Sequence, residues 1–174
     1  MDFVPIFEYD KRIERLFALV NESGVNVLDE ALEFWNDPKS LRKYFKSNSN
    51  VLKYYNMDVN TAVLKTTEIA RKIEDTLCDN QFCLDELFEK IDNRNYSYLE
   101  PDKYIHKWLR LYAIMLEPNH YVIVGSAIKQ SQVMQDNPHT AAELENVFKV
   151  RDFLMGEGIM DADSFKDAVF VLSL

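Results

Sequence analysis

The amino-acid sequence predicts an α+β fold in which a small antiparallel sheet is covered by about five helices. Residues 107–116 and 120–129 are rich in apolar and aromatic side chains and are joined by a short Pro-Asn connection, which indicates a β-hairpin. Apolar side chains recur at helical spacing in the stretches 26–36, 38–46, 58–78, 84–91 and 140–155. Antiparallel strands with helices on one side fit this pattern better than a βαβ architecture.

The composition indicates an ordered globular protein. The chain has 174 residues, of which 47% are hydrophobic, and only 4 Gly and 5 Pro, which argues against a long flexible linker. A single domain, 1–174, is therefore expected, with a helical N-terminal part at about 1–92 and a hairpin-plus-helix part at about 103–160.

The sequence also bears on location and cofactors. No run approaches the roughly 20 apolar residues that span a bilayer, and the N-terminus lacks the pattern of a signal peptide, so we expect a cytoplasmic protein without membrane contact. Cys78 and Cys83 have no second Cys pair and no nearby His, which is a poor pattern for zinc. No metal and no cofactor are predicted.

The N-terminal stretch before the first helix is ambiguous. Residues 16–20, LFALV, fit a short strand that is ended by the turn residues Asn21 to Gly24. The stretch 10–20 also fits a helix, because Ile13, Leu16, Phe17 and Val20 have helical spacing. A strand from this region is a candidate third member of the sheet.

Several helix boundaries carry local signals. Asp37 followed by Pro38 fits an N-cap with Pro at the first helical position. Thr140 and Glu143 fit a capping box, in which the carboxylate reaches back to the start of the helix. The apolar C-terminal segment 168–174 could form an edge strand or a docking segment.

The predicted hairpin is basic within an acidic chain. Residues 103–132 carry four cations and one carboxylate, hence a charge of +3, whereas the whole chain carries −9. An anionic partner would therefore be sought here first, although the total charge disfavours general nucleic-acid binding.

Alternation along the hairpin predicts two faces. One face is expected to be core, and a symmetric turn would pair residue 116 with 121, 112 with 125, 110 with 127 and 108 with 129. The other face would carry one cation between aromatic rings and would include Trp108, Arg110, Tyr112 and, by this register, Tyr121 and Lys129. A register slip would change this assignment.

Such a face could bind a single RNA strand. Cations contact phosphates and aromatic rings stack on bases, so the predicted RNA-binding residues are Lys107, Trp108, Tyr112 and Tyr121. Cleavage of RNA would need charge stabilisation at the phosphorane, for which Arg110 and Lys129 are candidates. It would also need proton transfer, for which the candidates are His106, His139, Lys107 and Tyr112.

The stretches WLRLYAI and YVIVGSAIKQSQ, followed by the predicted helix 140–155, resemble the C-terminal half of RelE/HigB-type toxins over about residues 103–155. The whole chain is also similar to uncharacterised bacterial proteins of this size. The toxin resemblance implies a small α+β bacterial mRNA endoribonuclease that acts on ribosome-bound mRNA and pairs with an antitoxin. It implies Arg110 and Lys129 as phosphate ligands, with Lys107 as a second cation.

Two classes of function therefore stay open. The first is a RelE-like, toxin-related protein that acts on or binds RNA through the hairpin. The second is a non-enzymatic acidic interaction protein of a toxin–antitoxin, phage-defence or other bacterial complex. A metabolic enzyme ranks third, because the sequence contains no Gly-rich phosphate loop, HExxH, GxSxG or zinc-binding motif. The oligomeric state is left open.

Overall fold

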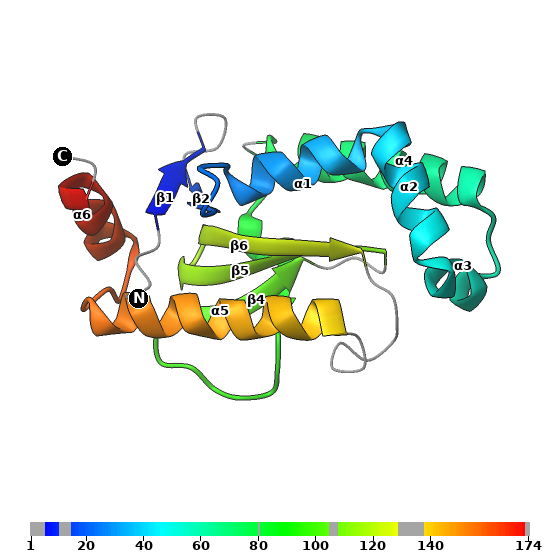
Figure 1. Ribbon diagram of the computed structural model, residues 1–174. Helices are drawn as coiled ribbons and strands as arrows, with labels where there is room; N and C mark the ends of the chain where they lie inside the picture. Colours follow the sequence, from blue (N-terminus) through cyan, green and yellow to red (C-terminus); the bar gives the residue numbers. More distant parts are fainter. Residues whose placement is uncertain (1–5, 11–14, 80, 105–107, 129–137, 173–174) are drawn as a thin grey trace.

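The computed structural model describes the chain apart from residues 1–5, 11–14, 80, 105–107, 129–137 and 173–174. Six strands form one sheet in the order β1-β2-β6-β5-β4-β3 (Figure 1). Their bounds are β1 Ile6–Tyr9, β2 Leu16–Val20, β3 Phe88–Lys90, β4 Glu100–Tyr104, β5 Leu109–Glu117 and β6 His120–Ile128. The α+β class is confirmed, and the predicted hairpin forms the centre of the sheet as β5 and β6.

The sheet is larger than predicted and is not purely antiparallel. β2 runs parallel to β6, with Leu16 opposite Tyr121, while the other neighbouring strands are antiparallel. Of the two alternatives for residues 10–20, the described part is therefore a strand at Leu16–Val20. A parallel partner requires a long crossover, and the helical layer that follows β2 provides it.

Helices cover both faces of the sheet (Figure 1). One face packs against α1, α2 and α4, and the opposite face packs against α5, with α6 next to β1. The helix bounds are α1 Val27–Trp35, α2 Pro38–Ser47, α3 Ser49–Tyr55, α4 Val59–Leu77, α5 Pro138–Gly156 and α6 Ala162–Leu172. The two apolar layers explain why both strands of the central hairpin are apolar on both faces.

The N-terminal cap predicted at Asp37 is confirmed, and Asn26 caps α1 in the same way. The Asn26 side chain accepts hydrogen bonds from the first turn of α1, and Asp37 does the same at Lys39 N in α2. The pKa of Asp37 is lowered, with the hydrogen bond from Ser40 as its largest cause. Local polar side chains thus set these boundaries independently of tertiary packing.

Two predicted elements are wrong. Residues 84–91 form a 3₁₀ turn, Leu84–Glu86, and strand β3 instead of a helix. The apolar spacing is real, but Phe88 pairs across the sheet edge with Tyr104, so tertiary pairing overrides the helical pattern. Of the two alternatives for residues 168–174, the edge strand is wrong, because the described part lies in α6; Ala168 packs against the core, which is compatible with the alternative of a docking segment.

The register of the central hairpin contains a bulge that sequence alternation did not anticipate. Arg110 lies opposite Ala127 and Tyr112 opposite Gly125, as predicted, but Ala113 lies opposite Ile123. Val124 is therefore an extra residue in β6, and the predicted pairing of residues 116 and 121 is wrong because Tyr121 lies opposite Met115. Relative to the predicted register, the bulge moves the side chains of β6 that precede Val124, Tyr121 to Ile123, to the other face.

Candidate functional site

The face of the hairpin that was expected to bind RNA lies inside the protein. The rings of Trp108, Tyr112 and Tyr121 are 1%, 0% and 1% exposed, and Arg110 is 8% exposed. Helix layers on both faces of the sheet cover these rings, so bases cannot stack on them in this conformation. The structure brings Arg110 and Tyr112 together on the α5 face, but the prediction that Trp108 and Tyr121 share this face is wrong, because both lie on the opposite face.

Trp108 joins β5 to the helices on one face of the sheet. Its Nε1 donates a hydrogen bond of 2.8 Å to Thr66 Oγ1 in α4, and its ring stacks on Phe45 of α2 with centroids 5.9 Å apart. The ammonium of Lys65 lies 4.7 Å from the ring centroid. These contacts are those of a core tryptophan with a satisfied indole N–H.

Arg110 and Tyr112 form a buried polar pair under α5. The Nη1 of Arg110 donates a hydrogen bond of 3.0 Å to the carbonyl oxygen of Tyr104. The hydroxyl of Tyr112 has no hydrogen-bond partner among the described residues. Burial raises the pKa of Tyr112 to about 12, the charge of Arg110 lowers it, and the charge of Glu143 raises it. Tyr112 is therefore a neutral phenol near a carboxylate.

The other predicted site residues can be located only in part. Lys107, Lys129 and the alternative proton donor His106 lie outside the described residues, as does the side chain of His139, whose backbone is in the first turn of α5. The described ends of the hairpin, Leu109 and Ile128, lie opposite each other at its open end.

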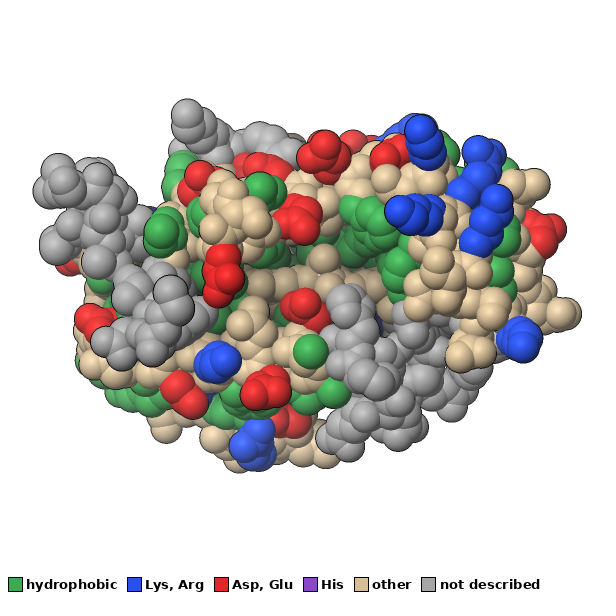
Figure 2. Space-filling model, viewed as in Figure 1, with side chains coloured by type: hydrophobic (Ala, Val, Ile, Leu, Met, Phe, Trp, Pro, Cys, Tyr) green, Lys and Arg blue, Asp and Glu red, His purple; other side chains and the backbone are tan. Residues whose placement is uncertain are grey.

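A cluster of exposed cations lies on α2 and α3. Between Pro38 and Met57 the chain has five cations and no carboxylate, which leaves −14 on the rest of the molecule. All five side chains are exposed, and Figure 2 shows Lys and Arg gathered over this end of the molecule. We call this cluster the basic surface; it consists of Lys39, Arg42, Lys43, Lys46 and Lys53.

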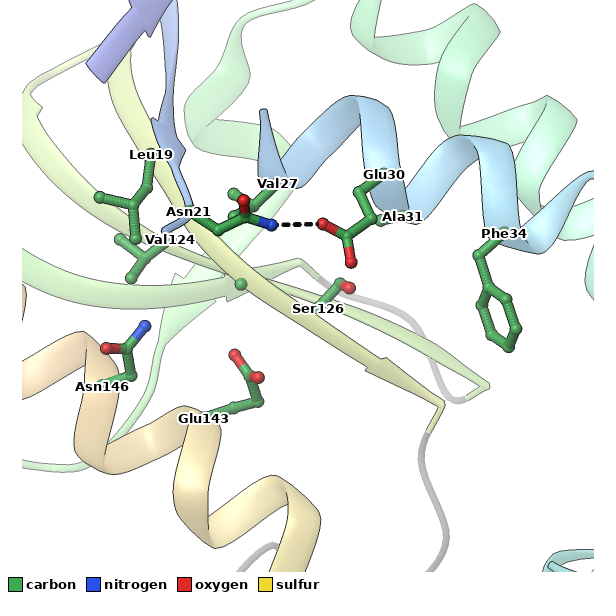
Figure 3. A pocket seen from close by; sticks show the side chains of 11 residues that line it. Leu19, Asn21, Val27, Glu30, Ala31, Phe34, Val124, Ser126, Glu143 and Asn146 are labelled. Atoms are coloured by element: carbon green, nitrogen blue, oxygen red, sulfur yellow. Dashed lines mark hydrogen bonds between the residues drawn. The ribbon is translucent and has the colours of Figure 1, made fainter. Parts of the chain in front are cut away.

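A cleft of about 310 Å³ opens at the sheet edge, between α1 on one face and α5 on the other (Figure 3). Its polar side chains are those of Asn21, Glu30, Ser126, Glu143 and Asn146. Apolar side chains complete its walls; these are Leu19, Val27, Ala31, Phe34 and Val124. The cleft is therefore amphipathic, with its described charges all negative.

The carboxylate of Glu143 lies directly over the backbone of Gly125. A Cβ at position 125 would overlap Glu143 Oε2 and would lie 3.1 Å from Glu143 Cδ, so only glycine leaves room for this carboxylate. The predicted role of Glu143 in a capping box is wrong, because α5 begins at Pro138, two residues before Thr140. The Glu143 side chain instead lines the wall of the cleft (Figure 3).

The electrostatics of the cleft disfavour a charged Glu143. Burial, the larger cause, and the negative charge of Glu30 across the cleft together raise the pKa of Glu143 to about 7. Glu30 itself accepts a hydrogen bond of 2.6 Å from Asn21 Nδ2. The cleft thus contains one carboxyl group that is hydrogen-bonded to Asn21 and one whose pKa is raised into the neutral range.

A second group of carboxyl groups, formed by Asp85, Glu100 and Asp102, lies near Tyr121. Asp102 in β4 is 2% exposed, and its Oδ1 has no hydrogen-bond partner among the described residues. Its pKa is raised to about 8 by burial, by a hydrogen bond and the charge of Glu100, and by the charge of Asp85. Asp85 accepts hydrogen bonds of 2.8 Å from the Tyr121 hydroxyl and 2.9 Å from Asn119 N.

Within the described part of the chain, no group of three or more His, Cys, Asp or Glu side chains could hold a metal ion. Among the described helices, none has the length and hydropathy that a bilayer-spanning segment needs. Neither a scan against protein-family models nor searches of curated proteins and of solved structures find a significant match to this chain.

Sequence reasoning missed the basic surface and both carboxyl groups. The basic surface could have been found by counting charges along 38–57, where five cations occur without one carboxylate. Glu143 and Asp102 carry no such signal, because their environment depends on a strand and a helix far away in the chain. The space above Gly125, which a residue without a side chain leaves open, is filled by Glu143.

Proposed function

We propose that this protein binds RNA through the basic surface on α2 and α3, as a relative of the RelE/HigB-type toxins. The observation that carries the proposal is the run of five exposed cations without a carboxylate in a chain of net charge −9. Phosphate contacts by Lys and Arg supply most of the affinity of sequence-independent RNA binding. A local cationic surface can do this even when the whole protein is acidic.

The position of the basic surface supports a link with the hairpin. The ring of Trp108, next to the start of β5, stacks on Phe45 of α2, so this end of the hairpin lies against the helix that carries most of the cations. The toxin resemblance implies phosphate contacts by Lys107 and Lys129, which are close in sequence to Leu109 and Ile128, the described residues at this end of the hairpin. An RNA strand bound on α2 would therefore extend to the open end of the hairpin, and its binding would not require bases to stack on the buried rings.

RNA binding is tested by fluorescence anisotropy with a labelled single-stranded RNA. The double variant Arg42→Glu/Lys43→Glu is compared with Arg71→Glu/Lys72→Glu on α4, which makes the same change in net charge at two other exposed cations. We expect at least about a tenfold loss of affinity in the first variant and less than about threefold in the second. Equal losses, or no binding by the wild type, would overturn the proposal.

Cleavage is a separate step and is tested in cells. Wild-type protein and the Lys107→Ala/Lys129→Ala variant are expressed in a bacterial host, and growth and mRNA integrity are followed. An endoribonuclease would arrest growth with loss of mRNA, and the variant would restore both. Arg110→Ala is less informative because Arg110 is buried and bonded to the Tyr104 carbonyl, so this variant also perturbs the fold.

The second candidate is a non-enzymatic interaction protein of a toxin–antitoxin or related complex. The burial of Trp108, Tyr112 and Tyr121 favours it, because no stacking platform is left open among these predicted residues. Under this candidate the wild type leaves mRNA intact, and the Arg42→Glu/Lys43→Glu variant loses a protein partner while RNA binding is absent from the start. RNA binding and mRNA integrity of the wild type, compared with the Arg42→Glu/Lys43→Glu variant, therefore distinguish the RNA-binding protein from the interaction protein.

A further inference from the structure

The cleft between α1 and α5 exists because two strands separate. The pairing of β2 with β6 ends at Ala18 and Ile123, and the bulge at Val124 follows immediately. Beyond this point the edge of β6 faces the gap between the two helices, which belong to different layers of the fold (Figure 3). The cleft is thus a product of the sheet topology and is flanked by rigid elements.

Two carboxyl groups face each other across this cleft. Glu30 projects from α1 and Glu143 from α5, and Figure 3 shows both beside Ser126 of β6. None of the described residues that line the cleft is a Lys, Arg or His. The negative charge of this site is therefore not balanced by the residues that form it, which is unfavourable in the absence of a bound cation.

The backbone of β6 leaves room for the Glu143 carboxyl group at one wall of the cleft. Glu143 is seated over Gly125, and Tyr112, which lies opposite Gly125 in the sheet, has a fully buried hydroxyl without a hydrogen-bond partner among the described residues. Tyr112 is not among the residues that line the cleft, although the charge of Glu143 contributes to its raised pKa. Within the cleft itself, two carboxyl groups, apolar walls and the lack of a described cation indicate a site that is completed by a ligand with a positive charge and an apolar part.

We propose that this cleft binds an alkylammonium group, with the amine held between Glu30 and Glu143 and the alkyl chain against Val27, Phe34 and their apolar neighbours. The amide oxygen of Asn146 and the hydroxyl oxygen of Ser126 supply further acceptors for the ammonium, whereas the amide of Asn21 is already bonded to Glu30 and to the backbone N–H groups of Ser23 and Val25. A volume of about 310 Å³ suits a small amine or a single lysine side chain, at the lower end of ligand pockets.

A divalent metal ion fits this site less well. Such ions take six or more oxygen ligands, or three protein ligands in a compact cluster, whereas the described residues contain no group of three metal-ligating side chains. Apolar walls also offer nothing to a hydrated ion, but they do bury the methylene groups of an alkylamine. The residues that line the cleft are not part of the basic surface, so binding of an amine in the cleft is independent of RNA binding.

The test is a titration of the full-length protein with pentylamine, followed by the amide NMR signals of Gly125, Ser126 and Asn146. Pentanol, which has the same alkyl chain without the charge, is the matched ligand control. We expect saturable shifts with pentylamine and none with pentanol at the same concentration. Absence of saturation with pentylamine, or equal shifts with pentanol, would overturn the proposal.

Variants then assign the binding to the carboxyl groups. Glu143→Gln is expected to weaken binding of pentylamine by at least about tenfold, whereas Glu145→Gln, at an exposed position of the same helix, changes it by less than about twofold. Glu30→Gln provides a second variant on the opposite wall. Unchanged affinity in both Glu143→Gln and Glu30→Gln would refute the site.

Two further ligands separate the sources of the amine. A short lysine-containing peptide with blocked termini represents a lysine side chain of a partner protein, and cadaverine represents a free diamine. Tighter binding of the peptide would indicate a lysine side chain of a partner protein as the ligand, and tighter binding of cadaverine would indicate a free diamine. Both results would support an alkylammonium site. Magnesium chloride is the third arm, and tighter binding of magnesium than of any amine, at the same three amides, would contradict an alkylammonium site.

Discussion

Asp102 and Glu143 are both carboxyl groups whose pKa is raised mainly by burial, but they lie in different kinds of site. Asp102 is 2% exposed and packed beneath Asp85 and Tyr121, so nothing larger than a proton can reach it. Glu143 is partly exposed and lines a cleft of about 310 Å³. One site is closed and the other is open.

The difference shows what a buried carboxyl group can do. In a closed site a buried carboxyl group avoids the cost of ionisation only by keeping its proton. Its pKa therefore differs between the folded and unfolded states, and the stability of the fold depends on pH. In an open site the same cost is also relieved by a ligand cation, so the group can serve in binding. The pKa shift alone does not distinguish the two cases; the space around the carboxylate does.

The largest predicted effect is on the closed site. Because the folded state holds the proton of Asp102 more tightly than the unfolded chain, whose pKa is near 3.8, stability is highest below that pH and falls as the pH rises to about 8. We expect wild-type protein to lose about 2–5 kcal/mol of unfolding free energy between about pH 5 and pH 8 through this group. Asp102→Asn, which retains a donor towards Glu100, should remove most of this loss.

Urea unfolding at the two pH values measures this effect. Asp152→Asn, on the exposed side of α5, is the control and should keep the wild-type pH dependence. Glu143, with its pKa of about 7, contributes a smaller loss of the same sign to all three proteins. A pH dependence of Asp102→Asn as steep as that of the wild type would show that Asp102 is ionised in the folded protein.

The second prediction disturbs the open site without changing its charge. Gly125→Ala places a methyl group where the Glu143 carboxylate lies, so this flexible side chain must turn towards solvent. The pKa of Glu143 should then fall from about 7 by about one unit or more, as hydration returns. Side-chain carboxyl NMR across the titration measures this pKa directly.

Gly156→Ala is the matched control for that experiment. Position 156 has no atom within 4 Å of an added Cβ, so the substitution should leave the pKa of Glu143 unchanged. An unchanged Glu143 pKa in Gly125→Ala would mean that its carboxylate does not depend on the glycine. The cleft would then be less rigid than its geometry indicates.

The local parts of this fold could be predicted from the sequence. Asn26 and Asp37 cap their helices through neighbouring backbone amides, and the hairpin pairs Arg110 with Ala127 as alternation requires. The helix expected at 84–91 failed because Phe88 finds its partner, Tyr104, sixteen residues later in the chain. Long-range pairing of this kind leaves no periodic signal in a short segment.

The candidate site was harder to predict for a related reason. An extra residue at Val124 sends Tyr121 to the face opposite Tyr112, and no composition rule places a bulge there. The second helix layer, which buries the ring of Tyr112, begins ten residues after β6 ends. Whether an aromatic, basic strand is a binding face or a core strand therefore depends on distant segments that cover it.

The smallest predicted effect tests the electrostatic link across the cleft. Glu30→Gln removes the negative charge that raises the pKa of Glu143, while the new amide oxygen can still accept the hydrogen bond from Asn21. Because burial is the larger cause, the pKa of Glu143 should fall by less than about one unit. Glu33→Gln, at an exposed position of the same helix, should leave it unchanged. A larger fall than that caused by Gly125→Ala would mean that charge repulsion, and not burial, dominates the open site, and the contrast with Asp102 would lie in the neighbouring charges instead of the surrounding space.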